Sequence, residues 1–235
     1  MNEKYINEYY DLEGHAKKRK SLGRASVVFF AGTKYLFDRI VASLALIILS
    51  PLILVIAIAI KIDSKGPVFF KQIRTGKHGK LFSIYKFRSM VANNDVHDLS
   101  KSDEFTKVGK FLRNTSLDEI PQFINIAKGN MSFIGPRPWI PEYYENMNEA
   151  QKHRCDVRPG ITGLAQVMGR NNIGIFKKIE YDLEYIKYYS FLQDFKIIFL
   201  TIKTIFTGKG VDVGKEGIQN ELEELKKKNK IKNKR

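Results

Sequence analysis

The sequence is poor in cysteine and histidine. Cys155 is the single cysteine among 235 residues, which excludes an intramolecular disulfide framework and fits a reducing compartment. The four histidines are scattered, and none forms an H-x-x-x-H pair, so no structural zinc site is expected. A secretory signal is also missing, because the apolar stretch begins only at Ile40, too far along the chain and too long for a signal-peptide core.

Acidic residues are scarce compared with basic ones. There are 25 Asp and Glu against 40 Lys and Arg, a formal charge of +15. Such a balance implies nucleic acid, an anionic membrane surface or phosphorylated substrates as partner. No nucleic-acid-binding motif is present and the basic residues are spread along the chain, so we expect no nucleic-acid partner. With 43% hydrophobic residues, the chain is long and apolar enough to fold around its own core.

Residues 40–60 carry no charge at all, and 14 of them are Leu, Ile or Val. As a helix the segment would be about 31 Å long, close to one hydrocarbon thickness. Insertion of so many aliphatic side chains into a membrane is favourable by several kcal/mol. A buried core helix is the alternative, but an uncharged run of this length is rare in a soluble domain of this size.

The same segment contains Ser50 and Pro51 at its centre. Proline removes an amide donor and clashes with the preceding turn, so we expect a kinked helix. Basic residues flank the segment on both sides, with Lys34 and Arg39 upstream and a series from Lys61 downstream. A simple span shows this bias on one side only. The pattern favours a re-entrant helix, with both chain ends on the cytoplasmic side, over a plain span.

Beyond the apolar segment, the pattern changes to short elements. Residues 68–70 and 81–85 are typical of strands joined by a glycine-containing turn. Apolar residues spaced three and four apart predict a short helix over 120–127. Residues 141–154 also have a helical pattern. An aromatic helical stretch over 178–206 has two open interpretations, core packing or a position in the membrane interface.

Two adjacent carboxylates, Asp118 and Glu119, stand where the short helix begins. Ser116 with Glu119 matches a capping box, which is the structural interpretation. Pro121 argues against it, because a cap at Ser116 puts the proline beyond the first turn. A start nearer Asp118 would place both acids at the helix mouth, where anions are favoured and stay ionised. There they could attack a substrate or hold a metal ion.

Three arginines are interpreted as lying in stiff segments rich in glycine and proline. They are Arg88 in Lys86–Met90, Arg137 between two prolines, and Arg158 in the run Arg158–Gly163. The planar fork of arginine matches two phosphate oxygens at once. Glycines such as Gly160 and Gly163 permit close backbone approach to a ligand, although a single R-P-G turn is more often structural. Carboxylates, rigid arginines and a membrane anchor together indicate phosphoryl chemistry on a lipid.

The chain resembles the bacterial sugar transferases, the small monotopic phosphoglycosyl transferases. The resemblance runs from about Lys34 to Val211 and covers most of the chain. The matching stretches are Asp38-Arg39, Ser50-Pro51, Gly66 to Gln72, Lys86 to Met90, Ser116 to Gln122, Gly135 to Pro138, and Arg158 to Val167. Ile120, Met168 and Phe176 depart from the family pattern and bear on substrate detail more than on chemistry.

The resemblance implies a two-step transfer of a sugar 1-phosphate from a UDP-sugar to polyprenyl (undecaprenyl) phosphate. Asp118 would be the nucleophile that carries the phosphosugar, and UMP would be released. Asp118 and Glu119 would hold Mg²⁺. The residues implied in binding phosphates and the nucleotide-sugar are Lys86, Arg88, Arg137, Arg158, Gly160, Thr162 and Gly163. The reaction would begin assembly of a capsule, an exopolysaccharide or a glycoconjugate, and downstream glycosyltransferases would be further partners.

The expected fold is an α/β-associated membrane protein, mostly helical around a small sheet, with one re-entrant helix and interfacial amphipathic helices. It would lie at the cytoplasmic face of a bacterial plasma membrane, with anionic lipids near its basic ends. We expect four regions: a basic N-terminal extension (1–33), the re-entrant helix kinked at Ser50 and Pro51 (34–62), a catalytic domain (63–212) and a basic tail (213–235). The tail could equally be a solvated end.

A non-catalytic membrane scaffold is the remaining alternative. It would leave the paired acids and the three arginines without a purpose. Loss of transfer activity in Asp118→Asn with normal membrane insertion would exclude the scaffold, and retention in the membrane after washing at high salt would exclude a nucleic-acid-binding protein.

Overall fold

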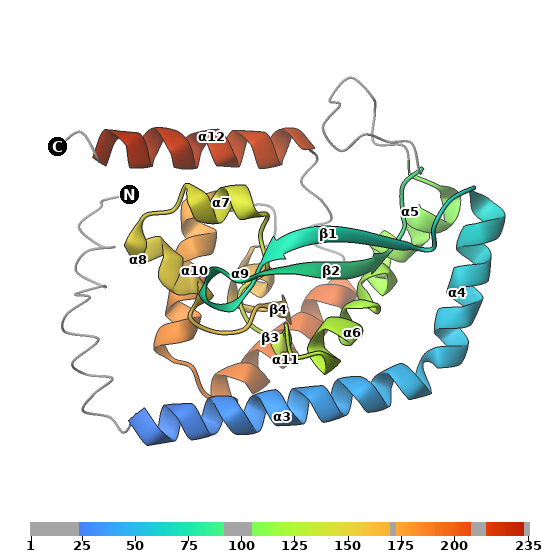
Figure 1. The fold of residues 1–235 in the computed structure, drawn as a ribbon, viewed down its shortest axis with the longest axis horizontal. Helices are drawn as coiled ribbons and strands as arrows, with labels where there is room; N and C mark the ends of the chain where they lie inside the picture. The colour runs from blue at the N-terminus through green and yellow to red at the C-terminus, as the bar shows by residue number, and fades with distance from the viewer. Residues whose placement is uncertain (1–23, 92–104, 170–172, 208–214, 233–235) are drawn as a thin grey trace.

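The computed structural model describes residues 24–91, 105–169, 173–207 and 215–232. Helices surround a β-hairpin and a second, short pair of strands (Figure 1). The elements in chain order are α3 (Arg24–Ile48), α4 (Ser50–Asp63), β1 (Phe69–Thr75), η1 (Lys77–Gly79), β2 (Leu81–Phe87), α5 (Lys107–Asn114), η2 (Leu117–Glu119), α6 (Gln122–Ala127), β3 (Ser132–Ile134), α7 (Pro141–Glu145), α8 (Glu149–Lys152), η3 (His153–Cys155), β4 (Gly160–Thr162), α9 (Leu164–Met168), α10 (Ile175–Lys187), α11 (Phe191–Thr207) and α12 (Lys215–Lys232). The predicted combination of many helices and little sheet is confirmed.

The apolar segment forms two helices that meet at a bend. Residues Ala31–Ile48 of α3 and Ser50–Asp63 of α4 are inclined by 62°, and Pro51 lies in the first turn of α4. The Ser50 hydroxyl donates a hydrogen bond to the carbonyl of Ile47, so the break has a local partner. Proline at the start of a helix loses no internal hydrogen bond, which explains why the new helix begins there. The predicted kink at Ser50 and Pro51 is therefore present.

Length and composition allow a membrane role for this pair only when its helices are taken together. In the described residues no single helix is long and apolar enough to cross a bilayer, whereas the bent pair meets both criteria. Figure 1 shows α3 along one edge of the molecule and α4 turning away from it. The helical region starts at Arg24, ten residues before the predicted membrane segment.

Most large side chains of the bent pair face outward. The exposed ones are Leu36, Phe37, Ile40, Leu44, Ile47, Ile48, Leu52, Leu54, Val55, Ile58 and Ile62. Only a narrow stripe of α4, Ile56 and Ile60, packs inward, against Phe87 and Leu112. The alternative of a buried core helix is wrong, because a core helix would hide most of these aliphatic groups.

The basic flank upstream of the bend is less open than the sequence suggests. Lys34 is buried and its ammonium lies 2.7 Å from a carboxylate oxygen of Asp194 in α11. Arg39 donates from Nε to the carbonyl of Ala127. Lys34 therefore ties α3 to α11, and its positive charge cannot count toward a membrane-facing flank.

The predicted hairpin is confirmed, and α6 is fixed to it. β1 and β2 pair antiparallel, with Phe69 opposite Phe87 and Thr75 opposite Leu81. Gly79 in the turn has a φ of 76°, a conformation that favours glycine. Asn125 of α6 accepts a hydrogen bond from the Tyr85 amide and donates one to the Ser83 carbonyl, using β2 groups that do not pair with β1. These two hydrogen bonds hold α6, the helix that follows the two acids, against the hairpin.

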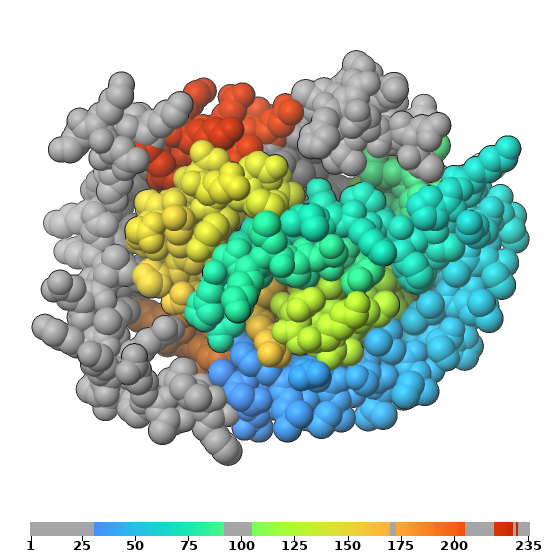
Figure 2. Space-filling model, viewed as in Figure 1, coloured from blue at the N-terminus to red at the C-terminus, as the bar shows by residue number. Residues whose placement is uncertain are grey.

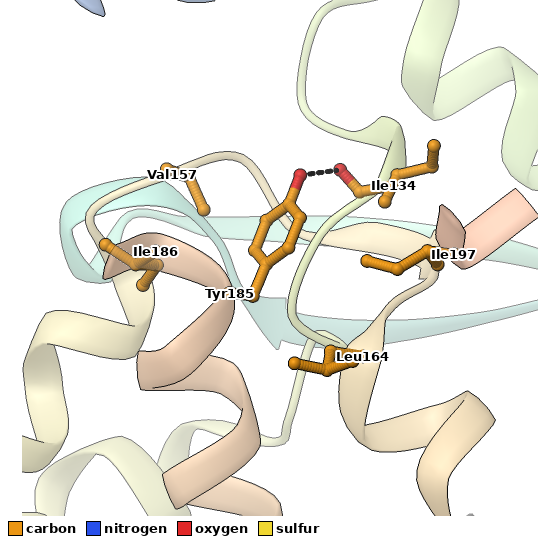
Figure 3. Packing of buried hydrophobic residues seen from close by; sticks show 6 residues of the cluster. All are labelled: Ile134, Val157, Leu164, Tyr185, Ile186 and Ile197. Atoms are coloured by element: carbon orange, nitrogen blue, oxygen red, sulfur yellow. Dashed lines mark hydrogen bonds between the residues drawn. The ribbon is translucent and has the colours of Figure 1, made fainter. Parts of the chain in front are cut away.

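β3 and β4 form a short parallel pair with no room for side chains between them. A Cβ atom on Gly160 would lie 2.1 Å from the Gly135 nitrogen, and one on Gly163 would lie 2.2 Å from the Gly135 carbonyl oxygen. Behind the pair, Tyr185 fills the centre of the main core and donates to the Ile134 carbonyl at 3.2 Å (Figure 3). The glycines thus let two backbone segments touch.

The aromatic stretch 178–206 is not one helix. It is divided between α10 and α11 by a break at residues 188–190. Core packing holds for part of the stretch, since Tyr185 is buried, whereas Phe191, Phe195 and Phe199 of α11 are exposed and lie outside the core. Phe195 and Phe199 are exposed together with Leu192 and Ile202, so α11 has an apolar outer face.

The C-terminal segment packs on the domain instead of being solvated along its whole length. Leu225 of α12 is completely buried against Tyr143 and Ile179. Glu221 accepts hydrogen bonds from Lys178 and from the Tyr143 hydroxyl. Figure 1 shows α12 lying across α7. The predicted helical region 141–154 is present as α7, α8 and η3.

Candidate active site

The two acids lie in a 3-10 turn between α5 and α6. Ser116 turns the chain with a φ of 57°, and its side chain makes no cap hydrogen bond. The capping box is therefore wrong, and α6 begins only at Gln122 with Pro121 as its N-cap. Leu117 and Ile120 pack with Phe87 and the inner stripe of α4. The bent helix pair thus supports the turn that carries the acids.

Glu119 is held by two cations. Lys86 Nζ lies 2.8 Å from Glu119 Oε1, and Arg137 Nη2 donates to the same oxygen at 2.9 Å. Lys86 comes from β2 and Arg137 from the segment after β3, so three separate parts of the sequence meet here. These charges keep the pKa of Glu119 well below its ordinary value, although its burial acts in the opposite direction. Glu119 is a carboxylate at neutral pH.

Asp118 is in a different condition although it is the adjacent residue. It is 6% exposed, and its nearest cation, Lys86 Nζ, is 3.7 Å from Oδ2. Within the described part of the chain, no hydrogen-bond donor reaches its carboxylate. Burial raises the pKa of Asp118 above its ordinary value, and the Glu119 charge acts in the same direction, against Lys86. The predicted helix-mouth stabilisation is absent, and the structure holds a poorly solvated carboxylate next to a paired one.

The buried ion pair of Arg154 and Asp182 holds the backbone of Arg137 in place. Arg154 donates to the Arg137 carbonyl at 2.8 Å and to Asp182 Oδ2 at 2.6 Å. Its guanidinium also lies 3.7 Å from the ring centre of Trp139. Sequence reasoning missed both residues of this pair. Asp182 had one detectable signal, since it falls on the apolar stripe of α10 with Ile179, where a charge needs a buried partner.

A small pocket opens next to Arg137. It is lined by Thr75, Gly76, Pro136, Arg137, Arg154, Cys155, Val157 and Pro159. The Thr75 hydroxyl is buried and has no hydrogen-bond partner in the described protein. Burial raises the pKa of the Cys155 thiol, which favours its neutral form in the lining of the pocket.

Arg88 is only two residues from Lys86 but points away from the acids. Its guanidinium donates to the carbonyls of Ser64 and Lys65 and to the Ser64 hydroxyl, at 2.7–2.9 Å. These groups form the C-terminal end of α4, whose last carbonyls need donors. In this structure Arg88 closes the bent helix onto the hairpin.

The segment Arg158–Gly163 makes its side-chain contacts with α3 and α11. The Arg158 guanidinium stacks on the Tyr35 ring of α3, with 4.1 Å to the ring centre. Thr162 shares a 2.8 Å hydrogen bond with Thr201 of α11, and Gly160 and Gly163 touch Gly135. Of the predicted binding residues, the structure brings Lys86 and Arg137 together with the two acids.

The carboxylates of the site could supply only part of the ligands that a cation such as Mg²⁺ requires. In the described chain there is no cluster of three or more acidic, histidine or cysteine side chains that could hold a metal by itself. Two adjacent carboxylates remain, and Mg²⁺ is commonly bound through one or two carboxylates plus substrate phosphates and water. Asp118 and Glu119 fit that smaller role.

With this geometry established, comparison with known proteins identifies the class. The bacterial sugar transferase family profile matches residues 29–208, so the chain belongs to that family. It is 50% identical over 188 residues to the UDP-glucose:undecaprenyl-phosphate glucose-1-phosphate transferase of Klebsiella pneumoniae, covering 75% of this chain and 40% of that protein. The chain thus spans less than half the length of this relative.

Shorter relatives are matched over nearly their whole length. The sugar transferase EpsL of Bacillus subtilis, described as uncharacterized, is 42% identical over 180 residues, which cover 76% of this chain and 89% of EpsL. The exopolysaccharide production protein ExoY of Sinorhizobium fredii is 35% identical over 197 residues, covering 76% and 87%. The matched region contains the hairpin, both acids and Arg137.

Proposed function

We propose that this chain transfers a sugar 1-phosphate from a UDP-sugar to polyprenyl phosphate, most specifically undecaprenyl phosphate, and releases UMP. The observation that carries the proposal is the buried Asp118 carboxylate, which accepts no hydrogen bond in the described chain and has Lys86 only at 3.7 Å, beside a Glu119 that Lys86 and Arg137 neutralise. Membership of the sugar transferase family and relatives named as undecaprenyl-phosphate sugar phosphotransferases support the choice of substrates.

In the first step an Asp118 oxygen attacks the sugar-linked phosphorus of the UDP-sugar. The bond from that phosphorus to the bridging oxygen breaks, and UMP leaves with the oxygen and its electron pair. The sugar phosphate remains on Asp118 as a mixed anhydride. A carboxylate with few hydrogen-bond donors is a better nucleophile than a fully paired one, which suits Asp118 and not Glu119.

In the second step a phosphate oxygen of the lipid attacks the same phosphorus, and the bond to Asp118 breaks to regenerate the carboxylate. Both steps bring anions together, so fixed positive charge must offset the repulsion. Lys86 and Arg137 supply it and orient phosphate oxygens, and the 44% exposed Arg137 side chain is accessible to the substrate. Mg²⁺, bound by Asp118 and Glu119, would offset the remaining charge of the diphosphate.

We also propose that the bent α3–α4 pair enters one face of the membrane and returns, at the cytoplasmic side of a bacterial plasma membrane. The exposed aliphatic groups along both helices and the outer face of α11 support this placement. Polar backbone groups stay satisfied across the bend through the Ser50 hydroxyl. Labelling of single cysteines placed before Arg24 and after Asp63 should find both on the same side. Opposite sides would instead indicate a span.

The covalent step can be tested directly. Purified protein with Mg²⁺ and a panel of UDP-sugars, without lipid acceptor, should show a phosphosugar adduct by intact mass, together with released UMP. Asp118→Asn should show neither, whereas Asp194→Asn, which removes a carboxylate from a second cluster, should still form the adduct in its folded fraction. No adduct with any sugar, and no UMP after adding undecaprenyl phosphate, would reject the proposed reaction.

A further inference from the structure

Arg158 is unusual among the arginines of this protein. Its backbone amide donates to the Tyr35 hydroxyl at 3.1 Å, and its guanidinium is stacked on the same ring. The side chain is thus fixed from two directions. Yet the guanidinium donates no hydrogen bond in the described chain, and its Nη1 atom is buried without a partner.

Two other buried arginines donate from their guanidinium groups to several protein oxygens, although the Nε atom of Arg88 has no partner in the described chain. Arg154 donates to Asp182 and to a carbonyl group, and Arg88 donates to three oxygens at the end of α4. A buried guanidinium nitrogen without an acceptor, such as Nη1 of Arg158, costs free energy, because its bond to water is lost and not replaced. An arginine held rigidly in that state is prepared for an acceptor from outside the protein.

The surroundings of Arg158 determine the charge of that acceptor. Arg39 is close enough to lower the pKa of Arg158, although burial lowers it more, and Lys77 Nζ lies 5.7 Å from the centre of the Tyr35 ring. In the described residues no carboxylate forms an ion pair with Arg39, Lys77 or Arg158. The nearest acid, Asp38, is already bound by Ser132. Arg158 and Lys77 over the Tyr35 ring, with Arg39 held nearby by the Ala127 carbonyl, thus form a group of cations without a carboxylate partner in the described chain, which favours an anion.

The site lies where apolar and basic surface meet. Leu36, Phe37 and Ile40 are exposed on the same stretch of α3 that carries Arg39. Figure 2 shows this region, where α3 (blue), the β1–β2 hairpin (teal) and α6 (lime) come together around a small part of the gold-coloured chain. A phosphate bound there would have aliphatic side chains beside it, as the head of a lipid does.

We propose that Arg158, Arg39 and Lys77, on the platform of Tyr35, bind the phosphate head of a membrane lipid at a site separate from Asp118 and Glu119. The fork of Arg158 takes two phosphate oxygens, and the other two cations supply charge. The inference rests on the part of the proposed function that places α3 at the membrane. It assigns to Arg158 a different phosphate from that of the nucleotide-sugar.

Native mass spectrometry of the full chain in detergent tests the site. The probes are dioctanoyl phosphatidylglycerol, farnesyl phosphate, inorganic phosphate and uncharged dioctanoylglycerol. We expect one tightly held lipid phosphate per chain, bound about tenfold or more weakly in Arg158→Gln and in Arg39→Gln. Lys196→Gln, which removes an exposed charge from α11, should change binding less than about twofold. Arg158→Lys keeps the charge but loses the fork, and should bind with intermediate strength.

The outcomes separate the possible sources of the phosphate. Preference for farnesyl phosphate would indicate the head of the polyprenyl acceptor, and preference for phosphatidylglycerol a resident phospholipid; either supports the site. Equal binding of inorganic phosphate, equal loss in Lys196→Gln, or unchanged binding in both arginine variants would overturn it. Should Arg158→Gln melt early, Arg39→Gln decides. UMP release assayed on the same preparations reports on the catalytic proposal independently.

Discussion

Two clusters in this protein have nearly the same composition and geometry. In one, Lys86 lies 2.8 Å from Glu119 and 3.7 Å from Asp118. In the other, Lys34 lies 2.7 Å from Asp194 and 3.7 Å from Asp38. Each is a lysine between two carboxylates, one close and one distant. Distances alone would not tell which of them performs chemistry.

The difference lies in what completes each cluster. In the Lys34 cluster the distant acid, Asp38, accepts a 2.5 Å hydrogen bond from Ser132, and the close acid, Asp194, accepts one from Tyr185. All three charged side chains are at most 8% exposed. In the Lys86 cluster the distant acid, Asp118, accepts no hydrogen bond from the described chain. The partly exposed Arg137 side chain places this cluster at the protein surface. A cluster in which every carboxylate accepts a hydrogen bond serves to hold helices together. A cluster in which one carboxylate lacks a donor is suited to receive a substrate.

Asp118→Asn should have the largest effect on activity and tests whether the Lys86 cluster performs the chemistry. We expect the rate of UMP release to fall by at least about 10⁴-fold, because the nucleophile is lost. Thermal stability should stay the same or rise, because a poorly solvated carboxylate becomes a neutral amide. Steady-state assays and melting curves on the same sample measure both. A large drop in melting temperature would place Asp118 among the structural carboxylates.

The reverse pattern is expected for Asp194→Asn. Lys34 would be left buried with only the distant Asp38, and the free energy of unfolding should fall by about 3–5 kcal/mol. The hydrogen bond with Tyr185 can persist, so the folded protein should retain its activity. Denaturant unfolding and the activity per folded molecule test this. Unchanged stability would show that the Lys34 cluster does not fasten α3 to α11.

A smaller effect is expected for Arg137→Gln. The charge that faces substrate phosphates is lost, and the rate should fall roughly 10²-fold. Lys110→Gln on the exposed side of α5 is the matched control and should retain the wild-type rate. If phosphate contacts form only in the transition state, kcat should carry the loss and KM should change little. A loss confined to KM would mean that Arg137 binds ground-state substrate only.

The smallest effect is a pH dependence of stability due to Glu119. Its folded pKa lies below the ordinary value of 4.5, so the unfolded chain binds the proton more readily. The stability contributed by its ionised form is therefore present above that value and is lost as the pH falls below it. The difference in unfolding free energy between wild type and Glu119→Gln should shrink from pH 6 toward pH 3.5. A constant difference would mean that Lys86 and Arg137 do not stabilise the Glu119 charge.

Sequence reasoning succeeded where the determinants are local. A proline within an uncharged run predicts a bend, and short apolar stretches on either side of a glycine turn predict a hairpin. The choice of Asp118 and Glu119 as the candidate site stays a prediction. It did not predict where a side chain points. Arg158 and Arg88 have phosphate-binding character by type, yet their neighbours are Tyr35, 123 residues away, and the end of α4.

Burial was equally hard to foresee at the two ends of the described chain. The sequence suggests that Lys34 is an exposed charge flanking the apolar segment. In the structure Lys34 is buried, because it pairs with Asp194, 160 positions later. The α12 segment reads as a solvated tail because of its lysines, while one apolar face with Leu225 is enough to dock it. In both cases the decisive contact is too distant in the sequence to leave a local pattern.

The contact between Gly135 and Gly160 has a practical consequence for protein engineering. Because the two backbones touch with no side chain between them, the segment bearing Arg137 and the segment bearing Arg158 behave as one rigid part made from two pieces of sequence. Chimeras between family members should therefore take both pieces from the same parent. A crossover placed between residues 138 and 158 would join backbones shaped for different partners, whereas one placed between β2 and α5 would leave this part whole.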